Sequence, residues 1–514
     1  MGDKKRVITV GTGPLHICDV LSVAAGEARV VLDESPAYRQ FLDRSVELVD
    51  RLISQGQTIY GVTTGFGDSC EKPIPPELSA RMAANLVRFH GCGTGRMLSD
   101  EECAAVIFVR LVSLAQGRSG VRPALLERLC DLLNHQSLPQ IPSEGSVGAS
   151  GDLTPLSYIA AVVMGEREVS YKGKVVPAAE ALGELRLKPI ELRPKESLAL
   201  MNGTSVMTGL ACLAYQRARQ LSRWASALTA MSSDVLRGNR GHFDDRIFLA
   251  KPHPGQRASA RWIAADIEYR GGSTQHDGRI QDRYSVRCAP HVIGVLLDSL
   301  SFIDGMLDIE INSSNDNPLF DVATDEVLHC GNFYGGHVCM AMDMLKTAVA
   351  NVADLIDRQM ALICNPATNN GLPADLVARN SADHATHHGF KAMQITASAL
   401  TAEALKLTMP ASVFSRSTES HNQDKVSMGS IASRDALRVL ELTETVLAVV
   451  QLALCQAVDL RNREGCHVRS KALHQAIRKY IAVNDADRRQ DGDIDRVLEM
   501  YRKRGLPIGE MDGV

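Results

Sequence analysis

One stretch of the chain surrounds a single serine with small residues and could make an electrophile from the backbone alone. It reads GSVGASGDLTPLSYIA over residues 145–160. Because Gly151 has no Cβ, its amide nitrogen can approach the carbonyl carbon of Ala149 closely. If that attack closes a five-membered ring and Ser150 then loses water, the product carries an exposed, electrophilic methylene group. The alternative is an ordinary turn before a helix, with Asp152 near the N-cap.

The elements that must position this tripeptide are mostly helices. Long segments with apolar residues at three- and four-residue steps dominate after residue 202, and several are apolar nearly all round. The first 60 residues instead mix short apolar runs with a helical stretch over 38–53, and the charged tail from 484 predicts a surface helix. The long segments cover roughly residues 205–236, 290–312, 340–364, 390–407 and 433–460.

This pattern predicts a mostly α protein, with a long central helical bundle and a smaller mixed N-terminal part that carries the tripeptide. The corresponding division of the chain is an N-terminal part over 1–200, a long-helix bundle over 201–483 and a C-terminal helical tail over 484–514.

Composition narrows the partners and the compartment. The 514 residues contain 56 Lys and Arg against 60 Asp and Glu, a net charge of −4, and only 4% are aromatic, which disfavours nucleic acid as a partner. The 12 cysteines fall singly, as is typical of reduced thiols in the cytoplasm. No apolar run reaches the roughly 18 residues of a membrane span. The nearest, 446–458, is interrupted by Gln451 and Gln456 and predicts a buried helix.

Eight stretches, in order along the chain, resemble the aromatic amino acid ammonia-lyase and aminomutase family, which includes histidine, phenylalanine and tyrosine ammonia-lyases. Beside 145–160 they are IYGVTTGFG (59–67), NLVRFHGCGTG (85–95), KESLALMNGTSVMTG (195–209), QDRYSVRCAPHVIG (281–294), EINSSNDNPLF (310–320), CGNFYGG (330–336) and TESHNQDKVSMG (418–429). The resemblance implies a histidine ammonia-lyase-like fold and a homotetramer whose active sites draw on several subunits. It also implies that Ala149, Ser150 and Gly151 cyclise to 4-methylidene-imidazol-5-one (MIO), with no metal.

The resemblance gives the catalytic residues their roles. Removing ammonia and a β-proton from an amino acid needs a strong electrophile and a base over the β-carbon. Tyr60 resembles the family's base, and its glycine-flanked loop would close over the substrate. Tyr284 resembles the second loop tyrosine, which supports elimination near MIO. Arg287 would bind the substrate carboxylate as a planar cationic fork.

Three further residues would line the same site. Gln281 would sit beside Tyr284, and Asn202 would hydrogen-bond the substrate carboxylate or the MIO carbonyl region. Phe333 resembles the aromatic residue that packs against MIO. The sequence departs from the family at Tyr334, where many bacterial members have histidine.

Two motifs indicate which aromatic ring the substrate carries. Phe89 and His90 match the family's selectivity pair, and a buried imidazole is better satisfied by a phenol hydroxyl than by a plain phenyl ring, unless His90 bonds to a neighbouring backbone group. Gln423 stands where histidine lyases carry an acid, which argues against histidine. The run that contains Glu419, Asn422 and Gln423 resembles phenylalanine lyases of plant type.

We therefore expect conversion of L-tyrosine to trans-4-coumarate and ammonia. Phenylalanine ammonia-lyase activity giving trans-cinnamate, a tyrosine or phenylalanine 2,3-aminomutase and, behind these, histidine ammonia-lyase activity stay open. Two other classes compete with the enzyme. His384 and His388 lie four apart, on one face if they are helical, and could ligate a metal, but no further ligands accompany them. A helical scaffold without activity fits the composition but leaves Tyr60 and the tripeptide unexplained.

Overall fold

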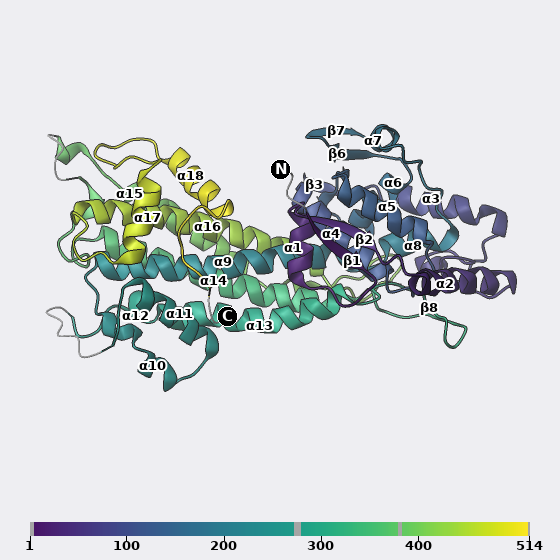
Figure 1. Cartoon of the computed structure of the whole chain (residues 1–514), viewed down its shortest axis with the longest axis horizontal. Coiled ribbons are helices and arrows are strands. Elements are labelled where there is room, and N and C mark those ends of the chain that lie inside the picture. Colours follow the sequence, from purple (N-terminus) through teal and green to yellow (C-terminus); the bar gives the residue numbers. More distant parts are fainter. Residues whose placement is uncertain (1–4, 272–278, 379–382, 512–514) are drawn as a thin grey trace. The chain divides into compact units, whose positions relative to one another are not determined.

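The fold is mostly α, as predicted, in a computed structural model that describes residues 5–271, 279–378 and 383–511 (Figure 1). The chain forms two compact units, each assembled from separate segments. The first contains residues up to Ala214, Ile303–Asp343 and Pro410–Arg434, and the second contains Tyr215–Phe302, Met344–Met409 and the chain from Asp435 onward. The division expected from the sequence has three contiguous parts, with boundaries at residues 200 and 483. Composition does not reveal which helix segments share a core, so that division stays a prediction.

The first unit contains the short strands. β1 (Arg6–Val10) and β2 (Ala28–Leu32) are apolar runs that pair in parallel, and α1 (Ile17–Ala24) connects them. β8 (Leu319–Asp321) and β9 (Glu326–Leu328) form an antiparallel hairpin. The other pairings join β3 (Thr94–Met97) to β5 (Pro142–Glu144), and β6 (Glu168–Tyr171) to both β4 (Leu138–Pro139) and β7 (Lys174–Pro177).

Helices make up the core of the first unit. α4 is buried along nearly its whole length because its residues are apolar on every face, and it begins at a capping box in which Ser99 and Glu102 satisfy each other's backbone N–H groups. It packs against α1 and α5, while α8 packs against α3 and α6. The bounds are α2 (Pro36–Ser54), α3 (Ser79–Phe89), α4 (Asp100–Leu114), α5 (Pro123–Asn134), α6 (Leu153–Val163), α7 (Ala178–Glu184) and α8 (Pro194–Met201).

Four long helices carry the chain from one unit into the other: α9 (Ser205–Val235), α13 (Ala289–Ile311), α14 (Gly336–Cys364) and α16 (Gly429–Leu460). Each falls close to a segment that apolar periodicity predicts, and α16 buries residues 446–458 as expected. Its glutamines are paired: Gln451 accepts a hydrogen bond from the Trp224 indole, and Gln456 donates to the Asn484 carbonyl. None of the helices in the described part of the chain is long and apolar enough to span a membrane.

Shorter helices complete the second unit. They are α10 (Asp245–Leu249), α11 (Pro254–Asp266), α12 (Tyr284–Arg287), α15 (Lys391–Lys406), α17 (Val468–Arg478) and α18 (Asp491–Arg502). The charged tail thus forms the expected helix, α18, which keeps Val497, Leu498 and Tyr501 buried on one face.

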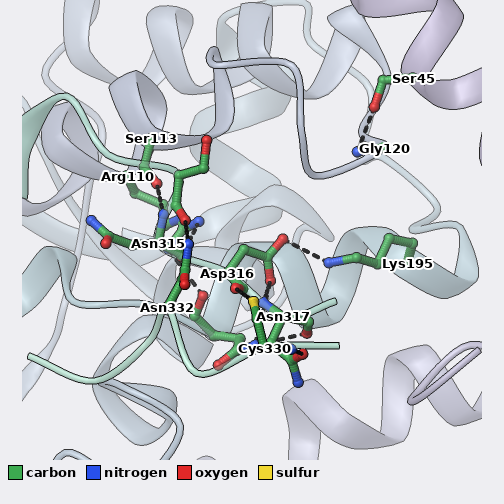
Figure 2. A network of polar contacts seen from close by, with 12 residues as sticks. Ser45, Arg110, Ser113, Gly120, Lys195, Asn315, Asp316, Asn317, Cys330 and Asn332 are labelled. Atoms are coloured by element: carbon green, nitrogen blue, oxygen red, sulfur yellow. Dashed lines mark hydrogen bonds and ion pairs between the residues drawn. The ribbon is translucent and has the colours of Figure 1, made fainter. Parts of the chain in front are cut away.

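A buried ion pair anchors the segment before β8 in the first unit. Lys195 Nζ, on α8, lies 2.6 Å from Asp316 Oδ2, and both side chains are almost completely inaccessible (Figure 2). The second Asp316 oxygen accepts a hydrogen bond from the Asn317 backbone and a longer one, 3.4 Å, from the Asn202 amide. Burial lowers the pKa of Lys195, and Asp316 opposes that effect.

We predict that Lys195→Met lowers the free energy of unfolding by roughly 3–5 kcal/mol, because it leaves the Asp316 carboxylate buried and unpaired. The matched control is Lys172→Met, which removes the exposed ion pair with Glu184, where the side chains are 67% and 50% accessible. That control should leave the free energy of unfolding nearly unchanged, because the pair is screened by solvent. Urea unfolding followed by circular dichroism measures both, and equal effects would contradict the prediction.

Candidate active site

A cavity of about 620 Å³ in the first unit brings together residues that are far apart in sequence. Its lining comes from the loop around Tyr60, the tripeptide, the chain that follows β9 and the loop over residues 422–426. The predicted site residues among its lining are Tyr60, Ala149, Ser150, Phe333, Asn422 and Gln423. The base, the serine of the tripeptide and the aromatic neighbour expected for MIO therefore share one cavity.

The tripeptide forms a tight turn just before α6. Ser150 has φ +50°, a left-handed conformation that is uncommon for a residue with a side chain, and Gly148 and Gly151 flank it with φ +77° and +73°. A Cβ on Gly151 would collide with the backbone of Gly203, and one on Gly148 would collide with the Ser427 hydroxyl. Only glycine fits at these two positions.

Asp152, the N-cap residue of α6, holds the turn in place. Its carboxylate accepts hydrogen bonds from the Met207 N–H at 2.9 Å and from the Ser430 hydroxyl, and so ties α6 to the first turns of α9 and α16. The side chain is fully buried, and burial raises the pKa of Asp152 to about 6 in spite of these donors.

The residues around the turn fit an MIO group. Neither Gly148 nor Gly151 has room for a side chain, and without a Cβ the Gly151 nitrogen can approach the Ala149 carbonyl carbon. The Gln423 amide donates to the Ser150 Oγ at 3.3 Å, and Phe333 lines the same cavity. Phe333 and the Gly203 backbone would hold the ring, and Gln423 binds the hydroxyl that leaves as water when the ring forms.

The Tyr60 loop closes on itself at the cavity. The Tyr60 hydroxyl accepts a hydrogen bond from the Gly67 N–H at 2.8 Å. Burial raises the pKa of Tyr60, the Gly67 N–H partly opposes that rise, and the nearby Glu419 carboxylate adds to it. The N–H of Gly67 thus provides a donor that stabilises the phenolate form needed in a base.

Glu419 acts on this loop and does not line the cavity. Both of its carboxylate oxygens lie 3.1 Å from the Asp68 N–H. Glu419, Ser420 and His421 all have left-handed backbones, with φ values of 47°, 54° and 62°, a costly arrangement for three residues with side chains. The strain places Glu419 against the Tyr60 loop and keeps Asn422 and Gln423 in the cavity wall.

Phe89 and His90 lie at the end of α3, and neither belongs to the cavity lining. Phe89 is 62% exposed, and its ring centroid lies 4.2 Å from that of His90. His90 Nδ1 lies 2.9 Å from the Leu86 carbonyl oxygen, so the backbone bond considered from the sequence is present. Because Nδ1 donates there and burial lowers the pKa of His90, its Nε2 is a hydrogen-bond acceptor.

Asn202 lies behind the cavity wall. Its amide nitrogen donates to the Asn317 carbonyl at 2.8 Å, and the Arg110 guanidinium donates to the Asn202 backbone carbonyl. The amide nitrogen is thus already engaged, while the side-chain oxygen is buried without a partner in the described structure.

Gln281, Tyr284 and Arg287 belong to the second unit and do not line this cavity. The Arg287 guanidinium lies over the Tyr284 ring, 4.6 Å from its centroid, and its Nε donates to the Asp282 carbonyl at 3.0 Å. The backbone thus engages Nε, and the two terminal nitrogens are the pair that can bind a carboxylate in a bidentate manner.

Sequence reasoning missed two basic side chains of the cavity wall, His329 and Lys425. Each is close to a motif that the sequence singles out. His329 lies directly before CGNFYGG, and Lys425 lies within TESHNQDKVSMG. The buried Lys195 and Asp316 were also missed, although each lies inside such a motif.

The expectation that His384 and His388 share a helix face is wrong. His384 begins a single 3-10 turn, η5 (His384–Thr386), and His388 lies beyond its end. Glycine at 389 and the preceding proline-containing loop do not sustain an α-helix here. Across residues 5–271, 279–378 and 383–511, no group of three or more His, Cys, Asp or Glu is arranged to hold a metal ion.

Known proteins resemble this chain in both sequence and fold. The family model for aromatic amino acid lyases matches residues 15–480. A histidine ammonia-lyase of Gloeobacter violaceus is 38% identical over 488 residues, 95% of this chain and 94% of the relative. A tyrosine ammonia-lyase of Cereibacter sphaeroides is 37% identical over 487 residues, 91% and 92% of the two chains. The crystal structure of a tyrosine aminomutase from Streptomyces globisporus superposes with a TM-score of 0.89 at 35% identity, covering 97% of each chain.

The fold and the cavity therefore define an enzyme with the histidine ammonia-lyase type of architecture. The chain belongs to the aromatic amino acid lyase family, and it is a carbon–nitrogen lyase.

Proposed function

We propose that this enzyme eliminates ammonia from L-tyrosine to give trans-4-coumarate, with Tyr60 as the base and MIO formed from Ala149, Ser150 and Gly151 as the electrophile. The observation that carries the proposal is that Tyr60 and Ser150 line one cavity. MIO supplies an exposed methylidene carbon that bonds to the substrate and makes ammonia a feasible leaving group.

The chain's own residues account for the proton transfer. Tyr60 takes the β-proton on its phenolic oxygen, and the Gly67 N–H stabilises the negative charge there before the transfer. Glu419 holds Asp68, one residue beyond Gly67, so the loop stays closed over the cavity and water is kept from the base. Before the ring forms, Gln423 orients the Ser150 hydroxyl that is lost as water.

The proposal of tyrosine rests on one inferred contact and one observation. We infer that the substrate ring extends beyond the cavity lining described above to His90, whose Nε2 is an acceptor that a phenol hydroxyl satisfies and a plain phenyl ring does not. The residue bonded to Ser150 is the neutral Gln423, so the carboxylate that would engage an imidazole substrate is missing at that position. Phenylalanine is the next candidate, with the exposed Phe89 providing apolar contact.

A tyrosine 2,3-aminomutase is a second candidate, supported by the close superposition on the aminomutase from Streptomyces globisporus. Such an enzyme would use the same residues and would return ammonia to the β-carbon. The two activities differ in how long the site retains the unsaturated acid and the ammonia.

We further propose a cytoplasmic homotetramer in which Arg287, Tyr284 and Gln281 of one copy complete the cavity of another. The twelve cysteines are free thiols, which suits a reducing compartment. The cavity of the first unit, as far as the chain is described, has no arginine in its lining, whereas an amino acid carboxylate is best held by one.

Ser150→Ala should remove most activity, because alanine has no hydroxyl to lose and the ring cannot dehydrate. The variant should keep its circular dichroism spectrum, and intact-mass measurement should show the wild type lighter than its sequence by two waters. A wild-type mass equal to the sequence mass would refute the cofactor assignment.

His90→Leu should lower kcat/KM for tyrosine relative to phenylalanine by roughly tenfold, because the acceptor for the phenol hydroxyl is lost. Ultraviolet absorbance distinguishes coumarate, cinnamate and urocanate when wild type and variant are incubated separately with tyrosine, phenylalanine and histidine. Chromatography for β-amino acids detects an aminomutase. A preference for histidine in the wild type would discard tyrosine as the substrate.

Chains with Ser150→Ala and chains with Arg287→Gln should complement each other when they are co-expressed. If each site takes Ser150 from one copy and Arg287 from another, some sites in mixed assemblies contain both native groups. The purified mixture should then exceed both parent variants in turnover, and activity no higher than that of the parents would show that both groups come from one chain.

A further inference from the structure

His329 contacts the backbone of the proposed base. The Tyr60 N–H donates to His329 Nε2 at 3.3 Å, and His329 lines the same cavity as Tyr60 and Ser150. The side chain is exposed within that cavity, and it follows directly on β9. Since Nε2 accepts this bond, the imidazole must be neutral and must hold its proton on Nδ1.

The backbone that carries His329 is fixed by the buried network of the first unit. The Cys330 N–H donates to Asn317 Oδ1 at 2.7 Å, and the Cys330 thiol donates to the Asp316 carbonyl at 3.4 Å (Figure 2). Asp316 is in turn held by Lys195. His329 therefore extends from a rigid segment toward a loop that is glycine-rich.

The Tyr60 loop needs such a support at this end. Its far end is held by Glu419 at Asp68, and the Tyr60 hydroxyl is held by Gly67, which belongs to the same loop. The bond from the Tyr60 N–H to His329 ties the residue itself to another part of the chain.

We propose that His329 is a positioning residue of the elimination, holding the main chain of Tyr60 so that its phenolic oxygen stays over the cavity. The proposal rests on the proposed role of Tyr60 as the base. Only neutral imidazole can do this, because protonation of Nε2 removes the acceptor. The other titratable groups that share the cavity wall are Tyr60, Cys70, Cys330, Asp424 and Lys425, and the Glu419 carboxylate lies against the Tyr60 loop.

The test compares two substitutions at His329. His329→Leu removes the acceptor and should lower kcat by roughly two- to tenfold with little change in KM, as expected for one net hydrogen bond. His329→Gln keeps an acceptor oxygen at a similar reach and should restore most of the kcat.

The matched control is His135→Leu, which changes an exposed histidine just after α5 and outside the cavity. It should leave kcat and KM unchanged. If His329→Leu does not fold, His329→Ala removes the same acceptor with a smaller side chain, and an unchanged kcat in that variant overturns the proposal.

Hydrogen exchange of the free protein measures the contact between the Tyr60 N–H and His329 without any turnover. It therefore tests this inference separately from the proposed function. The Tyr60 amide should exchange faster in His329→Leu than in the wild type at one pH, while His135→Leu should match the wild type. Unchanged exchange at Tyr60 overturns the contact. Faster exchange with unchanged kcat overturns the positioning role alone.

Discussion

The close approach of two backbones at Gly151 and Gly203 is the constraint on which the site depends. A Cβ on either glycine would collide with its surroundings: at Gly203 with the Arg110 guanidinium and the Asn315 carbonyl, and at Gly151 with Gly203 itself. The tripeptide is thus held by main-chain contacts on one side. Its other side, with the Ser150 hydroxyl, is left free to face the cavity.

Buried charges make that constraint rigid. Arg110 and Lys195 are buried cations, and Asp152 and Asp316 are buried anions, all in the first unit. Burial lowers the pKa of Arg110 to about 10 and raises that of Asp152 to about 6. Desolvation of this size is tolerated only where each group has fixed partners, so movement of one loop of the network disturbs the others.

The long helices could be predicted from sequence because apolar periodicity is a local property. Segments such as 205–236 and 433–460 correspond to α9 and α16 within a few residues. The strained turn at Ser150 could be expected too, since small residues flank it. The helix expected for His384 failed because spacing alone does not show whether a short segment between loop residues is helical.

Contacts between distant segments could not be predicted in this way. Lys195 and Asp316 pair across 121 positions, and His329 meets Tyr60 across 269, so neither pairing has a local signature. The motifs that contain these residues were visible, but only the fold shows which members face each other. Phe89 and His90 illustrate the reverse, because their residue types suggested a ring site while the structure places them outside the cavity lining.

The residues of the proposed chemistry are divided between the two units of the chain. The first unit has the tripeptide and the proposed base, Tyr60, in one cavity, and the second has Arg287, stacked on Tyr284 and anchored through Nε. Because these contacts already restrict the arginine side chain, little conformational freedom remains to be lost when it binds a carboxylate. The proposed role of Arg287 is therefore to orient the amino acid, and not to select its side chain. In the proposed function, ring selectivity depends on groups outside the cavity lining such as His90, whose acceptor nitrogen is set by the Leu86 carbonyl and not by the turn at Ser150. Substrate preference can therefore change without disturbing the electrophile, which is consistent with relatives of similar identity that are named for histidine and for tyrosine.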